Sequence, residues 1–255
     1  MPYITVLLNR KGGVGKSLVT VNLAAVYAEI LGCDAVAAEG VTAGNGPSVA
    51  VVSIDPQGTS IEHAEKVRKA GRPVPFRVVD ASQNLDKLRR LRRAKADIII
   101  VDTPGFMPLK AEDDEDESID PLGDGTTGDA LRAVLDVADD VIVPLEAEGS
   151  AFTPTRVTVE RVLIPRQIPY GVVVNNWDPR DGTADRDRTI SLVQRRGWEL
   201  YNATVRHYKP HTRGITNGRF CTQYESNHIA TKAKQDFVSL ALEHQLRRQM
   251  YAGGR

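Results

Sequence analysis

The feature that most constrains the fold is a regular alternation of short apolar runs with helix-like segments. The runs are rich in valine and isoleucine and alternate little, as parallel strands buried on both faces do. Strands are predicted at residues 3–8, 49–54, 76–79, 97–102, 141–145 and 170–174. Helices are predicted near residues 16–31, 60–70, 84–94, 128–137, 154–163, 186–195 and 229–249. The pattern predicts an α/β fold, a doubly wound, mostly parallel sheet flanked by helices, with ligands at the carboxyl ends of its strands.

The whole chain, residues 1–255, is expected to form a single domain, because no linker or internal repeat divides it. Two stretches interrupt the alternation, a Gly-rich one near 39–48 and an acidic one near 110–128, and both are predicted to be inserted loops. The two cysteines, Cys33 and Cys221, are too few for a four-ligand metal site and are expected to be free thiols in a reducing compartment.

Composition favours a cytoplasmic protein with no membrane partner. The chain is 41% hydrophobic and 26% charged, in the range of ordinary globular proteins. Its apolar runs fall short of the roughly 18–20 residues that span a bilayer. The first strand begins at Tyr3 without a basic and apolar leader, so a secretory signal is not expected.

The net charge of zero conceals a strong asymmetry along the chain. Residues 109–150 carry 14 acidic and 2 basic side chains, whereas residues 151–255 carry 17 basic and 9 acidic ones. The acidic run is interpreted as a solvated, self-repelling loop, with a protein-docking element, or a patch that keeps DNA off that face, as the alternatives. The basic C-terminal part indicates a polyanionic partner.

The segment "NRKGGVGKSLVT", residues 9–20, lies between a predicted strand and a predicted helix, where a phosphate-binding loop belongs. It departs from G-x-x-x-x-G-K-[ST] because Arg10 replaces the first glycine and Lys11 adds a second lysine. Lys16 is expected to reach the β- and γ-phosphates, and the Ser17 hydroxyl to bind Mg²⁺. The nucleotide-binding residues predicted in this loop are Lys11, Gly12, Gly13, Val14, Gly15, Lys16, Ser17 and Leu18.

Two carboxylates end other predicted strands at the same edge of the sheet. "IIIVDTPG" ends in Asp102, expected to hold Mg²⁺ through water, and "VVSIDPQGTS" ends in Asp55. A carboxylate at the position of Asp55 can orient or deprotonate the attacking water. Lys16, Asp55 and Asp102 are therefore predicted to be catalytic.

The motifs "KGGVGKS", "DPQGTS" and "VDTPG" resemble, in order, the deviant Walker A, A′ and B motifs of the ParA/MinD group of P-loop ATPases. The resemblance is strongest to small ParA-type partition ATPases and covers nearly the whole chain. It departs from the group at Ser53, where many relatives have another Asp, and at Gly105, which replaces a common second proline.

This resemblance implies ATP and Mg²⁺ as cofactors and an ATP-dependent homodimer. It implies that Lys11 is catalytic by crossing the dimer interface to the partner subunit's phosphates, as an arginine finger does. It also implies that Asp55 positions water and that Asn175 and Asn176 contact adenine. A ParB-like centromere-binding protein is the implied partner, one that stimulates hydrolysis.

Nonspecific DNA is the second implied partner, bound in the ATP state on the nucleoid. The predicted phosphate contacts are Arg206, Lys209, Arg213 and Arg219, with His207, His211, Lys232 and Lys234 nearby. The resulting prediction is a ParA-like ATPase that hydrolyses ATP to drive partition of plasmid or chromosomal DNA.

Other functions remain open at this stage. A GTPase is one, because "DTPG" and "NNWD" approach the GTPase motifs, although Asn176 replaces the base-reading lysine. A MinD-like or other cargo-positioning ATPase that does not act on DNA is another. Its membrane anchor would need an apolar helix face, but the stripe of Ile229, Ala233, Phe237 and Leu240 is expected to pack in the core. A biosynthetic ligase or amidase on the same fold is the last.

Overall fold

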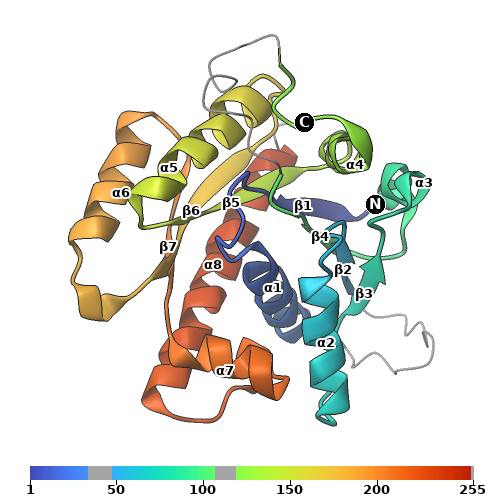
Figure 1. Ribbon diagram of the computed structural model, residues 1–255. Coiled ribbons are helices and arrows are strands. Elements are labelled where there is room, and N and C mark those ends of the chain that lie inside the picture. The colour runs from blue at the N-terminus through green and yellow to red at the C-terminus, as the bar shows by residue number, and fades with distance from the viewer. Residues whose placement is uncertain (34–47, 107–118, 254–255) are drawn as a thin grey trace.

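The structure, a computed structural model, describes residues 1–33, 48–106 and 119–253 of the chain. Within these residues seven strands form one sheet in which every neighbouring pair is parallel (Figure 1). The strands are β1 (Tyr3–Leu7), β2 (Val49–Ser53), β3 (Arg77–Asp80), β4 (Ile98–Asp102), β5 (Asp140–Glu146), β6 (Tyr170–Trp177) and β7 (Leu200–Arg206). Their order is β3-β2-β4-β1-β5-β6-β7, so the direction of winding reverses beside β1. The predicted doubly wound parallel sheet is confirmed.

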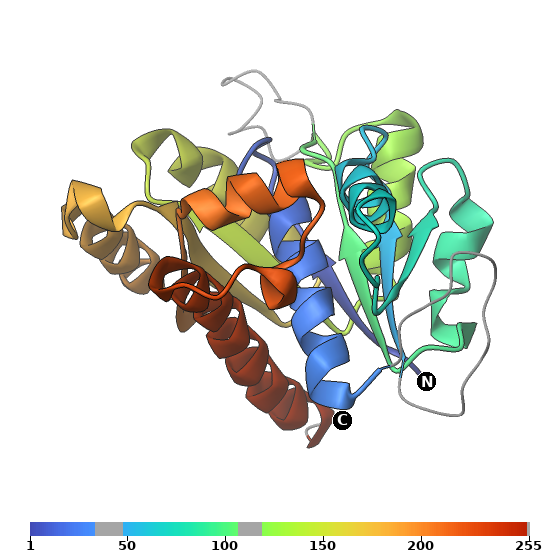
Figure 2. The same cartoon turned by 90° about the horizontal axis from the view of Figure 1, so that it is seen from below.

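Helices cover both faces of the sheet, as Figures 1 and 2 show. The helices are α1 (Lys16–Leu31), α2 (Thr59–Lys69), α3 (Leu85–Arg89), α4 (Gly125–Leu135), α5 (Gly149–Arg156), α6 (Ala184–Arg195), α7 (Lys209–Asn217) and α8 (His228–Gly253). Helices α3 to α6 share one hydrophobic core with the sheet, and α1, α2 and α8 share the other. Successive residues of β4 show the division, because Ile99 faces the first core and Ile100 the second.

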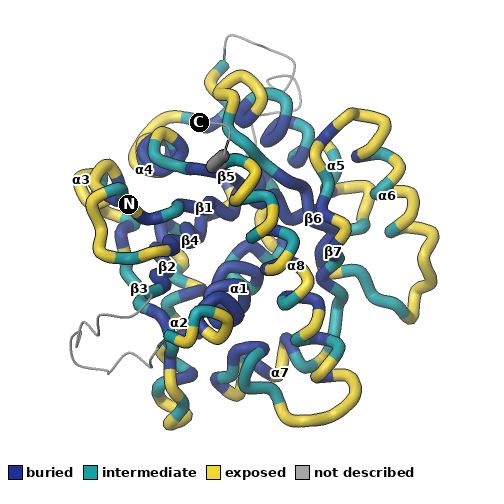
Figure 3. Tube along the Cα trace, turned by 180° about the vertical axis from the view of Figure 1, so that it is seen from behind, coloured by how far each residue is buried: buried dark blue, intermediate teal, exposed yellow. Residues whose placement is uncertain are grey.

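Burial explains why the sequences of the central strands are unbroken apolar runs. All five residues of β2 and of β4, and all seven of β5, are buried (Figure 3). An edge strand behaves differently. In β7 exposed or half-buried positions alternate with buried ones, and its sequence LYNATVR is correspondingly mixed. That mixture is why the apolar-run criterion missed β7, and α7 was missed because KPHTRGITN is short and polar.

Two predicted helices differ from the structure. The segment expected to be helical over 84–94 is the short α3 followed by a 3₁₀ turn at Leu91–Arg93. The helix expected over 154–163 begins earlier, at Gly149, so that Pro154 lies inside α5 rather than at its first position. A π-helical segment, Val157–Leu163, follows directly and accommodates the backbone distortion that an internal proline causes.

The two predicted inserted loops lie mainly outside the described residues. Of the acidic stretch near 110–128, residues 119–128 are described, and α4 already begins there at Gly125. The Asp120 carboxylate accepts hydrogen bonds from the Leu122 backbone N–H (2.9 Å) and from the Arg132 guanidinium (2.7 Å). Of the stretch near 39–48 only Ser48 is described.

Candidate functional site

The loop between β1 and α1 lies at the carboxyl edge of the sheet and ends in an uncapped helix. Gly15, the N-cap of α1, has a φ of 83° and a ψ of 21°, and no side chain caps the helix. The first backbone N–H groups of α1 therefore remain available to an anion. This is the geometry that a phosphate-binding loop requires.

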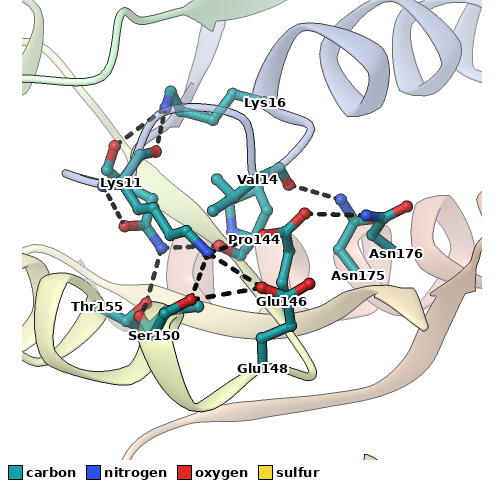
Figure 4. Close-up of polar contacts among 12 residues, drawn as sticks. Lys11, Val14, Lys16, Pro144, Glu146, Glu148, Ser150, Thr155, Asn175 and Asn176 are labelled. Atoms are coloured by element: carbon teal, nitrogen blue, oxygen red, sulfur yellow. Dashed lines mark hydrogen bonds and ion pairs between the residues drawn. The ribbon is translucent and has the colours of Figure 1, made fainter.

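Glycine is required in this loop at a close contact that the sequence did not reveal. The Asn175 side-chain amide on β6 donates a 2.7 Å hydrogen bond to the Val14 carbonyl. A Cβ at Gly15 would lie 2.4 Å from that amide nitrogen, on a backbone already in the left-handed region. Asn175, predicted to contact adenine, thus holds the loop against β6 (Figure 4).

Gly105 explains one departure from the usual motif. This residue follows β4 and packs against the backbone of Gly12, where a Cβ would lie 2.9 Å from the Gly12 N and Cα atoms. A side chain at position 105 would push the phosphate loop away, so glycine at 105 and glycine at 12 are linked by contact.

Lys16 lies within the loop. Its ammonium donates to the backbone carbonyls of Asn9 and Lys11, both at 3.0 Å (Figure 4). Burial lowers the pKa of Lys16 to about 8, and the negative charges of Asp102 and Asp55 oppose that fall. The structure therefore brings Lys16, Asp55 and Asp102 into one electrostatic environment, as the sequence predicted.

Asp102, the last residue of β4, is fully buried. Neither of its carboxylate oxygens has a hydrogen-bond partner among the described residues. Burial raises its pKa to about 6, and the neighbouring hydroxyls of Ser60 and Ser17 oppose the rise. A buried carboxylate with two unused oxygens beside a serine hydroxyl fits a magnesium ion that keeps most of its water ligands.

Asp55 lies in the turn between β2 and α2. One carboxylate oxygen accepts the Gln57 N–H at 2.9 Å, and the Asp55 carbonyl accepts the Gly58 N–H at 2.9 Å. These bonds fix the turn and leave the second oxygen free of any hydrogen bond within the described residues. The side chain is half-buried, so water can reach it.

The Lys11 ammonium makes a separate set of contacts, away from the phosphate-binding loop, here called the phosphate cradle, in which the Lys16 ammonium lies. Its ammonium lies 3.1 Å from Glu146 Oε2, 3.5 Å from Glu148 Oε2 and 3.1 Å from Ser150 Oγ (Figure 4). These three residues come from the end of β5 and the start of α5. The sequence reasoning did not single them out, although Glu146 ends a predicted strand just as Asp55 and Asp102 do.

Two asparagines, Asn9 and Asn176, form hydrogen bonds beside Lys11 and Glu146. Asn9, fully buried, accepts the Lys11 N–H at 2.9 Å and donates to the Pro144 carbonyl and the Thr155 hydroxyl, both at 2.8 Å. Asn176 donates to Glu146 Oε1 at 2.9 Å, and its carbonyl oxygen lies 2.8 Å from His207 Nδ1. The side chain of Asn176, the second predicted adenine contact, is therefore joined through Glu146 to Lys11.

The four predicted DNA contacts fall into two classes. Arg206 is bound to Asp236, with Nε 2.9 Å from Oδ2, and Arg219 forms an ion pair with Glu225 at 2.7 Å. Lys209 and Arg213 lie one turn apart on α7, and both are exposed. Of the four, Lys209 and Arg213 form no ion pair with a described residue. Of the neighbouring candidates, His211 is buried, which lowers its pKa to about 4.

Comparison with known proteins places this geometry in context. No family model matches the chain. The "Maintenance of carboxysome distribution protein A" of Gloeobacter kilaueensis is 29% identical over 245 residues, which are 95% of this chain and 94% of that protein.

Several solved structures share the fold over nearly the full length of both chains. A plasmid partition protein of Borrelia burgdorferi B31 bound to AMPPNP has a TM-score of 0.62 at 15% identity, covering 96% of this chain and 100% of that one. An ATP complex of McdA from Cyanothece has a TM-score of 0.59 at 14% identity, covering 94% and 96%. The MinD cell division protein of Aquifex aeolicus has a TM-score of 0.64 at 16% identity, covering 97% of each.

Proposed function

We propose that the chain is a member of the ParA/MinD group of P-loop ATPases, as the order of its motifs and its fold both indicate. We further propose that it is a Mg·ATP-dependent dimerising ATPase that positions a cargo. The observation that carries the proposal is the separation of the two lysines. Lys16 lies in the phosphate cradle beside Asp102, whereas the Lys11 ammonium is directed to Glu146 and Ser150. A second lysine beside the cradle but outside it suits a contact with another subunit.

Each residue of the site has a distinct task in hydrolysis. The N–H groups of the uncapped α1 and the Lys16 ammonium bind the phosphates, and Ser17 with Asp102 would hold Mg²⁺. That ion supplies charge neutralisation at the β- and γ-phosphates when it is bound. Asp55 orients the attacking water through its free carboxylate oxygen, and Lys11 of the partner subunit stabilises the charge that develops.

A pair of lysine variants tests the proposal. Lys16→Ala abolishes binding of a fluorescent ATP analogue, because the phosphates lose their cation within the cradle. Lys11→Ala binds the analogue as a monomer but forms no ATP dimer in analytical ultracentrifugation. Lys66→Ala, an exposed lysine on α2 that pairs with Glu62, is the control and changes neither readout. An intact ATP dimer in Lys11→Ala contradicts the task given to Lys11.

The finer proposal is that the ATP dimer binds DNA without reading its sequence, and that a ParB-like partner stimulates hydrolysis. The support is the exposed pair Lys209 and Arg213 on α7. DNA retention is measured with ATP, ADP and no nucleotide, each at low and at moderate salt, because phosphate contacts weaken steeply with salt. Retention is expected with ATP alone. In Lys209→Ala/Arg213→Ala retention is lost, whereas Arg206→Ala, which removes the ion pair with Asp236, is expected to leave most of the retention intact.

A cargo-positioning ATPase that does not act on DNA is the second candidate, and one observation favours it. Of the stripe expected in the core, Ala233, Phe237 and Leu240 are buried, whereas Ile229 is exposed, which corrects that prediction. On another side of α8 the exposed side chains Leu242, Leu246 and Met250 recur every four residues. Among the described residues, no helix is long and apolar enough to cross a bilayer. ATP-dependent sedimentation with anionic liposomes, lost in Leu246→Gln, would select this candidate over DNA binding.

A further inference from the structure

A groove on the sheet edge far from the phosphate loop is available to a ligand that the proposed ATPase cycle does not use. This cavity of about 690 Å³, here called the basic groove, lies between the β2, β3 and β4 strands and the segment from α3 to Lys95. Its floor includes Val52, Val79 and Ile99, from three neighbouring strands. Figure 3 shows the α3 segment as largely exposed tube beside these strands.

The rim of the basic groove carries an unusual density of positive charge. The cationic residues that line it are Arg77, Lys87, Arg90, Arg93 and Lys95. None of these five forms an ion pair with a described residue, whereas the adjacent Arg92 turns away to Asp139 at 2.7 Å. Asp86 is the acidic residue among those that line the groove. Like charges gathered around one cavity repel each other, so an anionic occupant would be stabilised there.

The apolar residues of the basic groove favour an acidic peptide over a nucleic acid as its occupant. Val52 (3% exposed) and Ile99 (1% exposed) belong to the core beneath the groove, whereas Val79 and Ala96 are half-buried and Ala94 is exposed. The residues that line the groove include no aromatic ring. Single-stranded nucleic acids are held on aromatic stacking platforms, which this groove lacks. An apolar floor inside a cationic rim instead matches a peptide that has small apolar side chains on one side and carboxylates on the other.

We propose that the basic groove docks an acidic, partly apolar peptide segment of a partner protein. The carboxylates of the peptide pair with the rim cations, and its apolar side chains lie against Val79, Ala94 and Ala96, the apolar lining residues that keep accessible surface. The β2 and β4 strands that form the floor lead to Asp55 and Asp102 at their carboxyl ends. A partner docked here would therefore contact β2 and β4, the same strands that lead to Asp55 and Asp102 in the nucleotide site.

Peptide binding to the full chain tests this proposal. The probe is a short fluorescent peptide of alternating Glu and Leu, compared with a Glu and Ser peptide of equal charge and with short duplex DNA. Arg90→Glu/Arg93→Glu is expected to weaken binding of the Glu and Leu peptide by about tenfold. The control Lys69→Glu/Arg195→Glu introduces the same change in net charge at exposed positions away from the groove, and it is expected to weaken binding by less than about threefold. Retained ATP-analogue binding shows that both variants are folded.

The outcomes separate the alternatives. A loss confined to the groove variant, together with weaker binding of the Glu and Ser peptide, supports the proposal. Equal losses in the two variants would show attraction by net charge alone and overturn it. Duplex DNA that loses affinity for the groove variant as strongly as the peptide would assign the rim to nucleic acid and also overturn it. Failure of the unmodified chain to bind the Glu and Leu peptide at low salt contradicts it as well.

Discussion

Two buried carboxylates, at opposite ends of the central strands, differ in their hydrogen bonding. Asp140 begins β5 and is 1% exposed, and one of its oxygens accepts from His244 Nε2 at 2.7 Å and from the Tyr3 hydroxyl at 3.1 Å. His244 in turn lies 2.6 Å from the hydroxyl of Tyr27 on α1, so α8 is bound to α1 as well as to the sheet. Asp102 ends β4, equally buried, and neither of its oxygens has a partner among the described residues.

The amino end of the sheet, at Asp140, is built for stability, and the carboxyl end, at Asp102, for binding. Buried polar groups are normally satisfied, because an unsatisfied one costs about 1–3 kcal/mol. Such groups also occur elsewhere, since Asp140 Oδ1 has no partner among the described residues, but Asp102 lacks partners on both oxygens, and the hydroxyls of Ser53 and Ser60, at the end of β2 and the start of α2, lack partners too. A chain retains such groups where a ligand completes them.

Removing His244 is expected to destabilise the protein by about 3–5 kcal/mol, because the Asp140 carboxylate then stays buried without its main partner. Urea unfolding of His244→Ala measures the loss. The control is His228→Ala, an exposed histidine at the start of the same helix, expected to change stability by less than about 0.5 kcal/mol. Similar losses of stability in the two variants would show that the contact between His244 and Asp140 does not stabilise the fold.

Asp102→Asn is expected to stabilise the nucleotide-free protein at neutral pH by about 1–3 kcal/mol, since each pKa unit is worth about 1.4 kcal/mol. The pKa of Asp102 rises from 3.8 to about 6 on folding, so the folded state binds more protons in that window. The stabilisation that proton binding to Asp102 gives the folded state is therefore fully present at low pH and is lost as pH rises from about 4 to about 6. Urea unfolding across this range should show the loss in the unmodified protein and not in Asp102→Asn.

Gly15→Ala is expected to destabilise the protein by about 1–2 kcal/mol and to weaken nucleotide binding, because its Cβ meets Asn175 on a left-handed backbone. Gly71→Ala is the matched control, because Gly71 also has a positive φ, of 69°, and a Cβ built on it has nothing within 4 Å. Thermal unfolding and ATP-analogue titration of the two variants measure the difference. Equal changes in unfolding temperature and in nucleotide affinity would show that the contact with Asn175 does not exclude a side chain at position 15.

Glu146→Gln is expected to strengthen the ATP dimer by about twofold to fivefold, because it weakens the contact that holds Lys11 within its own subunit. Glu148→Gln should have a smaller effect, since Glu148 is 64% exposed and its oxygen is 3.5 Å from the ammonium. Sedimentation analysis of dimer formation against protein concentration makes the comparison. A weaker dimer in Glu146→Gln would mean that Glu146 supports the Lys11 contact in the dimer rather than competing with it.

Local patterns predicted much of the fold and part of the site. Six of the seven strands could be predicted because central parallel strands are apolar throughout, and the carboxyl-edge rule placed Asp55 and Asp102 beside the phosphate loop. The contacts of Lys11 could not be predicted, because Glu146 is 135 residues away along the chain and its approach depends on how β5 lies beside β1.

The ion pairs of the predicted DNA contacts could not be predicted for the same reason. Arg206, Lys209, Arg213 and Arg219 were predicted as phosphate contacts, but Asp236 on α8 binds Arg206 where the helix packs against β7. The sequence contains the charges of both partners, yet only the packing of α8 decides which cations stay exposed.

The most direct test of the central claim is thermal unfolding of the unmodified protein and of Asp102→Asn, each with and without Mg·ATP. If the buried carboxylate is kept for its ligand, Asp102→Asn unfolds at the higher temperature without nucleotide and gains much less than the unmodified protein when Mg·ATP is added. If Asp102→Asn is the less stable protein without nucleotide, or gains as much from Mg·ATP, the buried carboxylate is not kept for a ligand.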